Sequence, residues 1–298
     1  MDDHRAFSPA QLAPIVGVSE STMKRWVDSG LLRAEKTPGG HRKISVADLL
    51  AFLRSRGRPM PSLEGLAVLV DHVSDPSIEG VTPETLAGVL ARGDAAVARA
   101  MIIRQFKAGR PLDETLDRLV GPAMAEIGTQ WAEGRIDVYR EHVATLRVWS
   151  VLGELRALLP VPPESAPLAL GGAPEGDPYL LPTMMAELTL AEMGWRAINI
   201  GPNTPIDSFL EAIRVHGPQL VWLSVTSLSP RAAFFEDYPR MFEAAAARGV
   251  QVAVGGQGLT ADLQDRLVAS AFGTRLAHLK TFARILFSGS TAQPSGPP

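Results

Sequence analysis

Two short runs near the N-terminus carry hydroxyl, imidazole and cationic side chains that could bind a polyanion. The first run is STMKRW, in which Trp26 is expected to pack inward, and the second is HRK. Lysine and arginine near phosphates and bases supply both affinity and sequence readout for nucleic acid. The candidate contacts are Ser21, Thr22, Lys24, Arg25, His41, Arg42 and Lys43.

Two short helices joined by a tight turn are predicted to position the first run. Ser8 can cap the first helix, Gly17 supplies the turn, and Ser19 or Ser21 can cap the second helix, which ends at Gly30. This order is typical of a helix-turn-helix, whose second helix enters the major groove of DNA. The alternative is a small basic helical domain whose charges are only solvated.

The second run is predicted to lie in a wing. Pro38, Gly39 and Gly40 force a turn between two short extended arms, and Ser45 can cap a third helix. Residues 1–57 are therefore predicted to form a winged helix-turn-helix head.

The charges are divided unevenly along the chain. The sequence has 29 Lys and Arg against 32 Asp and Glu, a net charge of −3, yet residues 1–60 hold ten cations and six acids. The remainder is therefore acidic, and only the head is expected to meet a polyanion.

Composition limits the class of protein. The 298 residues are 46% hydrophobic and 20% charged, which fits packed domains rather than a disordered chain. No apolar run is long enough for a membrane helix, and the first ten residues lack the apolar core of a secretory signal. Cysteine is absent, which excludes disulfides, thiolate ligands and cysteine nucleophiles. We expect a cytoplasmic, nucleoid-associated protein without membrane contact.

A helical domain is predicted at 63–160, after the Pro- and Gly-rich segment GRPMPS. Its helices are expected to start at Thr82, Asp94, Asp113 and about Val138, with the third of them running through Gln130. Short Gly- and Pro-containing connections between these helices predict a four-helix bundle.

An α/β domain is predicted at 167–289, where short apolar strands alternate with helices. This pattern favours a doubly wound, Rossmann-like parallel sheet, with a ligand outside the carboxyl ends of the strands. Residues 290–298 are expected to form a disordered tail.

The run GVSESTMKRWVDSGLLRAEKTPGGHRKISVADL resembles the N-terminal module of MerR-type transcription regulators over about residues 7–55. The resemblance implies a winged helix-turn-helix that binds double-stranded promoter DNA with a palindromic operator as a dimer. It places Thr22, Lys24 and Arg25 on the recognition helix and the HRK run in the wing.

The body resembles cobalamin-binding modules. Trp131 precedes Glu141-His142 by nine intervening residues, as in their helical cap, and APEGDPYLLP, NIGPNTP, LSVT and AVGGQG match their strand-end loops in order. With the head included, the chain resembles light-responsive repressors of the CarH/LitR type over about residues 7–285. Taken one at a time, Trp131 could be an ordinary aromatic of the bundle core, Glu141-His142 a surface pair, and Gly255-Gly256 a strand-to-helix turn. The implied cofactor-binding residues are Trp131, Glu141, His142, Asp177, Tyr179, Ser224, Thr226, Gly255 and Gly256.

One loop departs from that family's Asp-x-His-x-x-Gly pattern, in which the histidine coordinates cobalt and the aspartate orients it. Asp177 is kept, but Tyr179 replaces the histidine and Pro182 replaces the glycine. Ala132 also stands where light-responsive members often carry a histidine. A neutral phenol is a poor cobalt ligand, so no metal-ligating residue is predicted.

Three interpretations of the pocket follow. Adenosylcobalamin could bind without the usual lower axial histidine. Biliverdin, haem or another tetrapyrrole could instead bind noncovalently, with Trp131, His142, Tyr179 and Trp222 suited to stacking and hydrogen bonding. In the third interpretation there is no cofactor, and the body serves protein–protein interaction.

The sequence thus predicts a dimeric or tetrameric transcription regulator, expected to be a repressor. Ligand or light would change its oligomerisation and thereby its operator binding. The alternatives are a ligand-free regulator and a corrinoid methyltransfer protein, which the missing loop histidine disfavours. No catalytic residues are predicted.

Overall fold

The computed structural model describes residues 6–37, 39–58, 80–229 and 231–290. The chain divides into two compact units, Met1–Asp75 and Pro76–Pro298. The predicted linker GRPMPS lies mostly outside the described residues. The tail after residue 290 also lies outside them. Within the described part, none of the helices has the length and apolar character needed to cross a bilayer.

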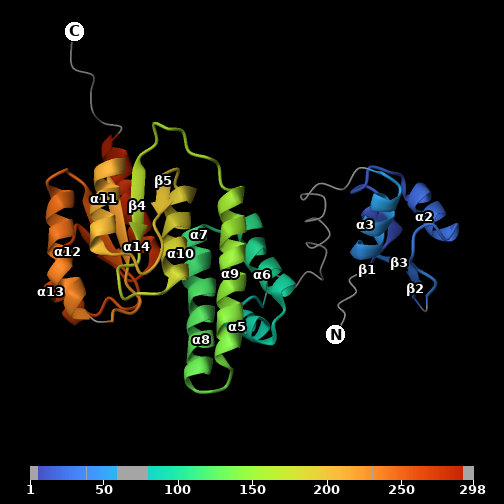
Figure 1. Ribbon diagram of the computed structural model, residues 1–298, viewed down its shortest axis with the longest axis horizontal. Coiled ribbons are helices and arrows are strands. Elements are labelled where there is room, and N and C mark those ends of the chain that lie inside the picture. The colour runs from blue at the N-terminus through green and yellow to red at the C-terminus, as the bar shows by residue number, and fades with distance from the viewer. Residues whose placement is uncertain (1–5, 38, 59–79, 230, 291–298) are drawn as a thin grey trace, which may run out of the picture. The chain divides into compact units, whose positions relative to one another are not determined.

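The first unit is a small helical head with a three-stranded antiparallel sheet in the order β1-β3-β2 (Figure 1). Ser19, not Ser21, caps the second helix, since its Oγ accepts the backbone N–H of Thr22 at 3.2 Å. Met23, Trp26 and Ile44 are buried together and close the core. The elements are β1 (Ala6–Phe7), α1 (Pro9–Leu12), α2 (Glu20–Asp28), β2 (Glu35–Lys36), β3 (Arg42–Ser45) and α3 (Val46–Ser55).

The second unit begins with a helical bundle. Its first helix starts at a capping box on Thr82 with Pro83 in the first turn, as the sequence predicts. The elements are α5 (Pro83–Arg92), α6 (Ala95–Lys107), α7 (Leu112–Thr115), the π-helical segment η1 (Leu116–Val120), α8 (Gly121–Ala132) and α9 (Val138–Leu158).

The predicted third helix is present as a continuous helical run from Leu112 to Ala132, but it contains a π-helical turn that the sequence did not predict. A π-helical turn at Leu116–Val120 separates α7 from α8. Such turns occur mostly as single insertions within α-helices, often at functional sites. Here the segment contributes Leu116 and Asp117 to the wall of the cavity described below.

A five-stranded parallel sheet follows, in the order β5-β4-β6-β7-β8. The order reverses at β4, which defines a switch point where ligands bind in open α/β sheets. The sequence predicts the first four strands but not β8, a three-residue edge strand. The strands are β4 (Leu168–Gly172), β5 (Arg196–Asn199), β6 (Leu220–Ser224), β7 (Gln251–Gly255) and β8 (Ala271–Gly273).

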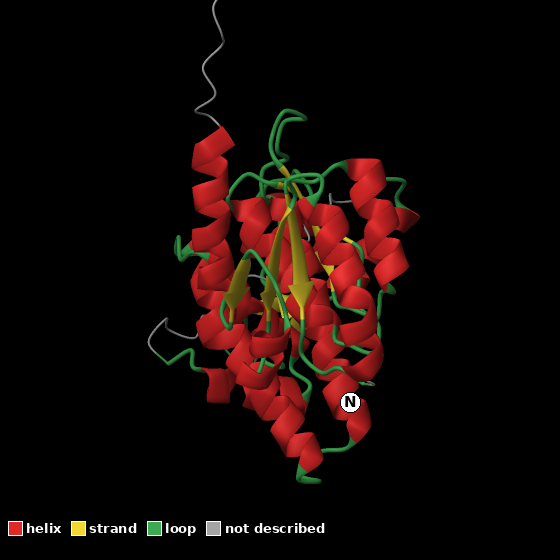
Figure 2. Ribbon diagram, turned by 90° about the vertical axis from the view of Figure 1, so that its left-hand side faces the viewer, coloured by secondary structure: helices red, strands yellow, loops and turns green. Residues whose placement is uncertain are grey.

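Helices cover both faces of the sheet (Figure 2). Side chains of α11, α12 and α13 pack on one face around Val221, Val252 and Val254, whereas α10 and α14 pack on the other around Trp222. The helices are α10 (Leu180–Glu192), α11 (Ile206–His216), α12 (Arg231–Ala246), α13 (Ala261–Arg266) and α14 (Leu276–Ser290).

Candidate ligand cavity and nucleic-acid interface

A cavity of about 1200 Å³ lies in the second unit, between the bundle and the carboxyl ends of the strands. Its wall on the bundle side comes from η1, α8 and the start of α9. The opposite wall comes from α10, α14 and the loops that follow β4, β6, β7 and β8. Small-molecule sites usually have about 300–1,000 Å³, so this cavity admits a ligand larger than most metabolites.

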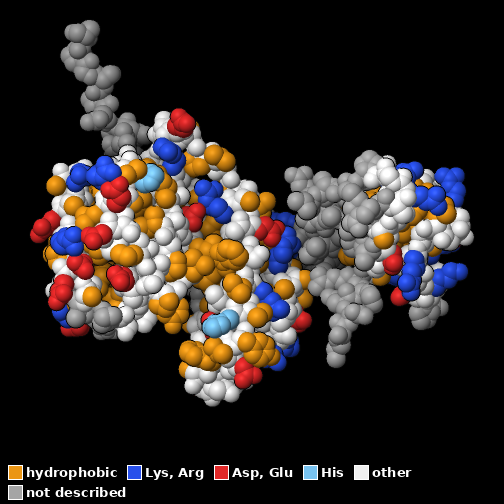
Figure 3. Space-filling model, in the orientation of Figure 1, with side chains coloured by type: hydrophobic (Ala, Val, Ile, Leu, Met, Phe, Trp, Pro, Cys, Tyr) orange, Lys and Arg blue, Asp and Glu red, His pale blue; other side chains and the backbone are white. Residues whose placement is uncertain are grey.

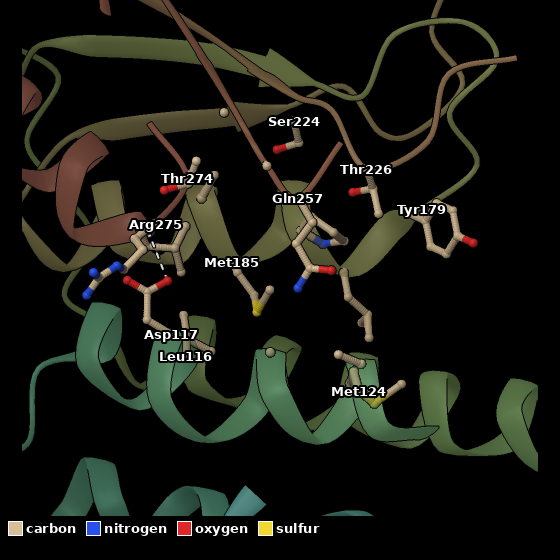
Figure 4. A pocket seen from close by; sticks show the side chains of 18 of the residues that line it. Leu116, Asp117, Met124, Tyr179, Met185, Ser224, Thr226, Gln257, Thr274 and Arg275 are labelled. Carbon is tan, nitrogen blue, oxygen red and sulfur yellow. Dashed lines mark hydrogen bonds between the residues drawn. The ribbon is translucent and has the colours of Figure 1, made fainter. Parts of the chain in front are cut away.

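The ends of the cavity differ in chemistry (Figure 4). Tyr179 lies at one end, Thr274 and Arg275 lie at the other, and the sulfur-bearing side chains of Met124 and Met185 lie between them. Thioethers are polarizable and adaptable, and they contact aromatic rings favourably. The middle of the cavity is thus suited to a large apolar or aromatic surface.

Eight of the nine cofactor-binding residues predicted from sequence line this cavity. They come from segments far apart in the chain, which the fold brings to one place. They are Trp131, Glu141, His142, Tyr179, Ser224, Thr226, Gly255 and Gly256.

The aromatic side chains of the cavity rim are partly exposed. Trp131, at the end of α8, is 47% exposed, and Tyr179, just before α10, is 46% exposed. His142 lies on α9 with its Nε2 atom 3.6 Å from Glu141 Oε2. Large aromatic surface left uncovered on a cavity wall is available to stack against a bound ring.

Asp177 is the ninth predicted residue, and it does not line the cavity. Its fully buried carboxylate accepts backbone N–H groups from Thr226 at 2.5 Å, Ser227 at 3.0 Å and Tyr179 at 3.1 Å. Burial raises the pKa of the Asp177 carboxyl, while these backbone donors act in the opposite direction. Asp177 therefore fastens the loop after β4 to the loop after β6.

Trp222 also has a structural role. Its indole is buried, donates from Nε1 to Thr183 Oγ1 at 3.0 Å and lies against β4, where a Cβ on Gly171 would fall 2.2 Å from its ring. The ring contributes to the cavity wall but is held in the packing between β4 and α10. The indole therefore belongs to the packed wall of the cavity, and its ring is not free to stack on a ligand.

The last residue of β7, Gly255, and the following Gly256 are required by close approaches between backbone segments. A Cβ on Gly255 would lie 2.7 Å from the carbonyl oxygen of Gly273, and one on Gly256 would lie 2.2 Å from that of Val225. Gly256 also has a φ of +121°, which side-chain-bearing residues rarely adopt. These glycines close the loop that borders the cavity.

Several cavity residues were not predicted from the sequence. Asp117 on η1 accepts the backbone N–H of Leu276 at 3.0 Å and of Ala277 at 3.1 Å, which caps α14 from the bundle (Figure 4). Gln257, Thr274 and Arg275 follow β7 and β8 and also line the cavity. No local signal marks Thr274 and Arg275, because β8 and α14 were not predicted, whereas Gln257 lies within the AVGGQG run noted in the sequence.

The loop after β4 and the helices of the cavity wall differ in the ring systems that they present. The loop at 177–182 presents the Tyr179 phenol rather than an imidazole, and the imidazoles on the described wall, His142 and His278, lie on helices α9 and α14. Among the described residues, no three His, Cys, Asp or Glu side chains gather into a metal site.

The head presents a polar face on α2. Ser21, Lys24 and Arg25 are exposed, whereas Met23 and Trp26 on the other side of this helix are buried. Lys24 pairs with Glu20 at 2.7 Å one turn earlier. Arg25 forms no ion pair with the residues that the structure describes.

The wing is a short hairpin tied to α2. Strand β2 pairs with β3, and the Thr37 N–H donates to the His41 carbonyl at 2.9 Å. Arg42 donates to Asp28 Oδ1 from Nε at 2.9 Å and from Nη2 at 2.6 Å. This pair fixes the wing relative to the end of α2, although it was not predicted.

An apolar stripe runs along the outer face of α9. Tyr139, Leu146 and Trp149 are 55%, 58% and 46% exposed, and their spacing places them within one face of the helix. Hydrophobic side chains gather over this region in Figure 3. Contiguous exposed apolar surface of this kind often marks an interaction site.

Two family models match the chain. The model for a helix-turn-helix domain matches residues 6–57, and the model for a B12 binding domain matches residues 84–155. The first match covers the head and the second covers the bundle, so both lie where the corresponding elements are observed.

Curated relatives extend across both units. The chain is 27% identical to the HTH-type transcriptional repressor CarH of Myxococcus xanthus over 265 residues, covering 82% of this chain and 86% of the relative. It is 26% identical to the HTH-type transcriptional repressor CarA of the same organism, covering 83% and 85%. Among solved structures, the Methanosarcina barkeri monomethylamine corrinoid protein has a TM-score of 0.57 at 16% identity, covering 68% of this chain and 96% of that one.

The helix-turn-helix head identifies a DNA-binding regulator, and its body combines a B12-binding-type bundle with a Rossmann-like parallel sheet. The similarity to CarH and CarA spans both units in the same order. The chain therefore resembles regulators of the CarH type in sequence and in domain order, and its similarity to repressors supports a regulatory rather than an enzymatic role.

Proposed function

We propose that this protein is a DNA-binding repressor whose body binds a tetrapyrrole-class cofactor in the cavity between bundle and sheet. The observation that carries the proposal is the convergence of eight residues, chosen from the sequence alone, on one cavity of about 1200 Å³. The match to a B12 binding domain over residues 84–155 supports a corrinoid as the first candidate within this class.

The residues present fit a large ring system. Trp131 and Tyr179 offer partly exposed aromatic faces, and Met124 and Met185 offer adaptable apolar surface between the two ends. In this arrangement the rim aromatics stack on the ring, while Ser224 and Thr226 offer hydroxyl groups at the strand ends. Bound cobalamin would supply the photochemistry or ligand exchange of its cobalt–carbon bond.

The cobalamin proposal does not use a protein ligand below cobalt. Tyr179 occupies the position of the usual lower histidine, and Asp177 is engaged by three backbone N–H groups rather than by an imidazole. Adenosylcobalamin would therefore be held by the cap and the strand-end loops. The same feature favours a second candidate, biliverdin or another tetrapyrrole bound noncovalently, because such a ring needs no lower ligand.

In the head, we propose that α2 enters the major groove and the wing follows the adjacent backbone. The operator is expected to be palindromic promoter DNA, because a dimer presents two identical heads. The proposed contacts are Ser21, Thr22, Lys24, Arg25, His41, Arg42 and Lys43.

The cofactor is proposed to act by changing how bodies associate. The apolar stripe of Tyr139, Leu146 and Trp149 supports self-association, since it leaves a helix face of the bundle uncovered. A dimer or tetramer engages several heads at once, and such avidity strengthens binding by roughly 10²–10⁴. A light-absorbing cofactor would make this step light-responsive in the cytoplasm.

The test is the visible absorption spectrum of full-length protein after desalting, following separate incubation in the dark with adenosylcobalamin and with biliverdin. Retained cobalamin absorption that changes on illumination supports a photoreceptor without a histidine below cobalt. Retention of biliverdin alone, with a shifted and sharpened band, assigns the cavity to that chromophore. If neither is retained, the cofactor proposal fails and the body is a ligand-free interaction module.

A further inference from the structure

The charges around the cavity are unevenly placed. Of the described residues that line it, Arg275 is the one whose side chain is permanently cationic, whereas Asp117 and Glu141 are the acids. Arg275 lies beside Thr274, at the end of the cavity opposite Tyr179 (Figure 4). The cavity therefore has an aromatic end and a cationic end.

Both acids on the wall already have partners. Asp117 accepts two backbone N–H groups at the start of α14, at 3.0 and 3.1 Å, and Glu141 accepts the Thr145 hydroxyl at 2.9 Å. The positive end of the α14 dipole is thus satisfied by Asp117 and is not itself free to bind an anion.

Arg275 has no such partner. Its side chain is exposed and forms no hydrogen bond or ion pair with any residue that the structure describes. Its backbone is nevertheless held, because its carbonyl accepts the His278 N–H at 3.1 Å and the preceding Gly273 pairs with Gly255 across the sheet edge. A guanidinium without a described partner, on a held backbone at the cavity rim, is available to a ligand.

We propose that Arg275 binds an anionic oxygen group of the cofactor and so selects among tetrapyrroles. The inference rests on the proposed function, since it names the part of the cofactor that this end of the cavity recognises. A guanidinium pairs with two oxygens of a carboxylate or phosphate in a bidentate geometry. The Thr274 hydroxyl, next to it on the same wall, supplies a further donor.

Two groups of the candidate cofactors carry this chemistry. Biliverdin has two propionate side chains, and each ends in a carboxylate. Cobalamin carries neutral amide side chains and one phosphodiester, which lies in its nucleotide loop. Each cofactor has an analogue without the anion: biliverdin dimethyl ester, in which both carboxylates are esterified, and adenosylcobinamide, which lacks the nucleotide loop together with its phosphodiester.

The experiment compares the affinity of full-length wild type, Arg275→Gln and Arg275→Lys for these four compounds by absorption or fluorescence titration in the dark. Arg248→Gln is the matched control, because Arg248 is exposed in the turn that follows α12 and does not line the cavity. Thermal unfolding of each variant shows that the fold is kept.

We expect Arg275→Gln to weaken binding of one cofactor that carries the anionic group by about 10- to 100-fold and to leave binding of the analogue without that group unchanged. Arg275→Lys should recover part of the loss, and Arg248→Gln should bind as the wild type does. A loss of affinity for biliverdin alone would show that Arg275 binds a carboxylate. A loss of affinity for adenosylcobalamin alone would show that Arg275 binds the phosphodiester.

Equal affinity of Arg275→Gln and wild type for all four compounds would overturn the inference. An equal loss for both members of a pair would also overturn it, because the arginine would then act through shape rather than charge. If the wild type binds none of the compounds, the proposed function itself is wrong, and this failure is distinguishable from a specific failure of Arg275.

Discussion

Lys280 on α14 forms an ion pair with Asp113 at the start of the third bundle helix, 167 residues earlier in the chain. Their side chains are only 17% and 13% exposed. Glu192 on α10 lies 3.5 Å from the same ammonium group and also accepts the Leu112 N–H at 2.8 Å. This cluster fastens the bundle to the sheet beside the cavity, so it positions both cavity walls.

Lys280→Met is expected to destabilise the second unit. The substitution keeps most of the side-chain volume but leaves two mostly buried carboxylates without their cation, which typically costs about 3–5 kcal/mol for a fully buried pair. Because the cluster keeps some exposure, we expect a loss of about 3 kcal/mol in the free energy of unfolding, measured by denaturant titration.

Arg118→Met is the control for that measurement. Arg118 pairs with Glu114 at 3.5 Å on the bundle surface, and its side chain is 77% exposed. Exposed pairs contribute little, so this variant should unfold close to the wild type. Equal effects of the two substitutions would contradict a special role for Lys280.

The contribution of Asp177 to the free energy of unfolding is expected to decrease as the pH rises. Burial raises the pKa of its carboxyl above 3.8, the ordinary value, so the folded state holds this proton more tightly than the unfolded state. Its contribution to stability is therefore fully present below 3.8 and is lost as the pH rises through the folded-state pKa.

The corresponding measurement is the free energy of unfolding of wild type minus that of Asp177→Asn, across a series of acidic to neutral pH values. The difference should decrease with rising pH, because asparagine does not titrate. An increase would mean that the hydrogen bonds from Thr226, Ser227 and Tyr179 outweigh burial in setting this pKa.

Arg25→Ala should weaken DNA binding and reduce its dependence on salt. Arg25 is exposed on α2 and has no ion-pair partner among the described residues, so its full charge is available to a phosphate. Loss of one phosphate contact lowers the slope of log K against log salt by about 0.9. Titrations of labelled promoter DNA at several salt concentrations provide this slope.

Arg42→Ala provides an internal comparison for that experiment. Arg42 shares its charge with Asp28 through two hydrogen bonds, so its removal should change the salt slope less than removal of Arg25. Neither variant should change the spectrum of a cofactor bound in the body. A larger effect on the slope from Arg42→Ala would place the wing, rather than α2, at the main phosphate contact.

Local sequence chemistry predicted much of the fold. Ser8 and Thr82 cap helices where their side chains can accept a backbone N–H of the first turn. The alternation of apolar strands with helices after residue 167 predicted four of the five strands. These features depend on neighbouring residues, so the sequence contains them directly.

Contacts between distant segments were not predicted. The bonds from Leu276 and Ala277 to Asp117 join residues about 160 positions apart, and they depend on a helix that has no strong local start signal. The π-helical turn at η1 likewise has no marker in the sequence. For the same reason, the cationic end of the cavity at Arg275 emerged only from the structure.

The most direct test of tetrapyrrole binding in the cavity is to place a large side chain on the cavity wall. Gly128 on α8 lines the cavity, and a Cβ built there meets no atom within 4 Å. Gly153 on α9 is equally open but lies outside the cavity, which makes it the matched control. A tryptophan at either position replaces a helical glycine and should keep the fold.

The measurement is retention of adenosylcobalamin and of biliverdin by Gly128→Trp, Gly153→Trp and wild type after desalting in the dark. We expect the wild type and Gly153→Trp to retain one of these tetrapyrroles equally and Gly128→Trp to lose it by at least about tenfold, or 1.4 kcal/mol. Full retention by a folded Gly128→Trp protein would contradict binding in this cavity.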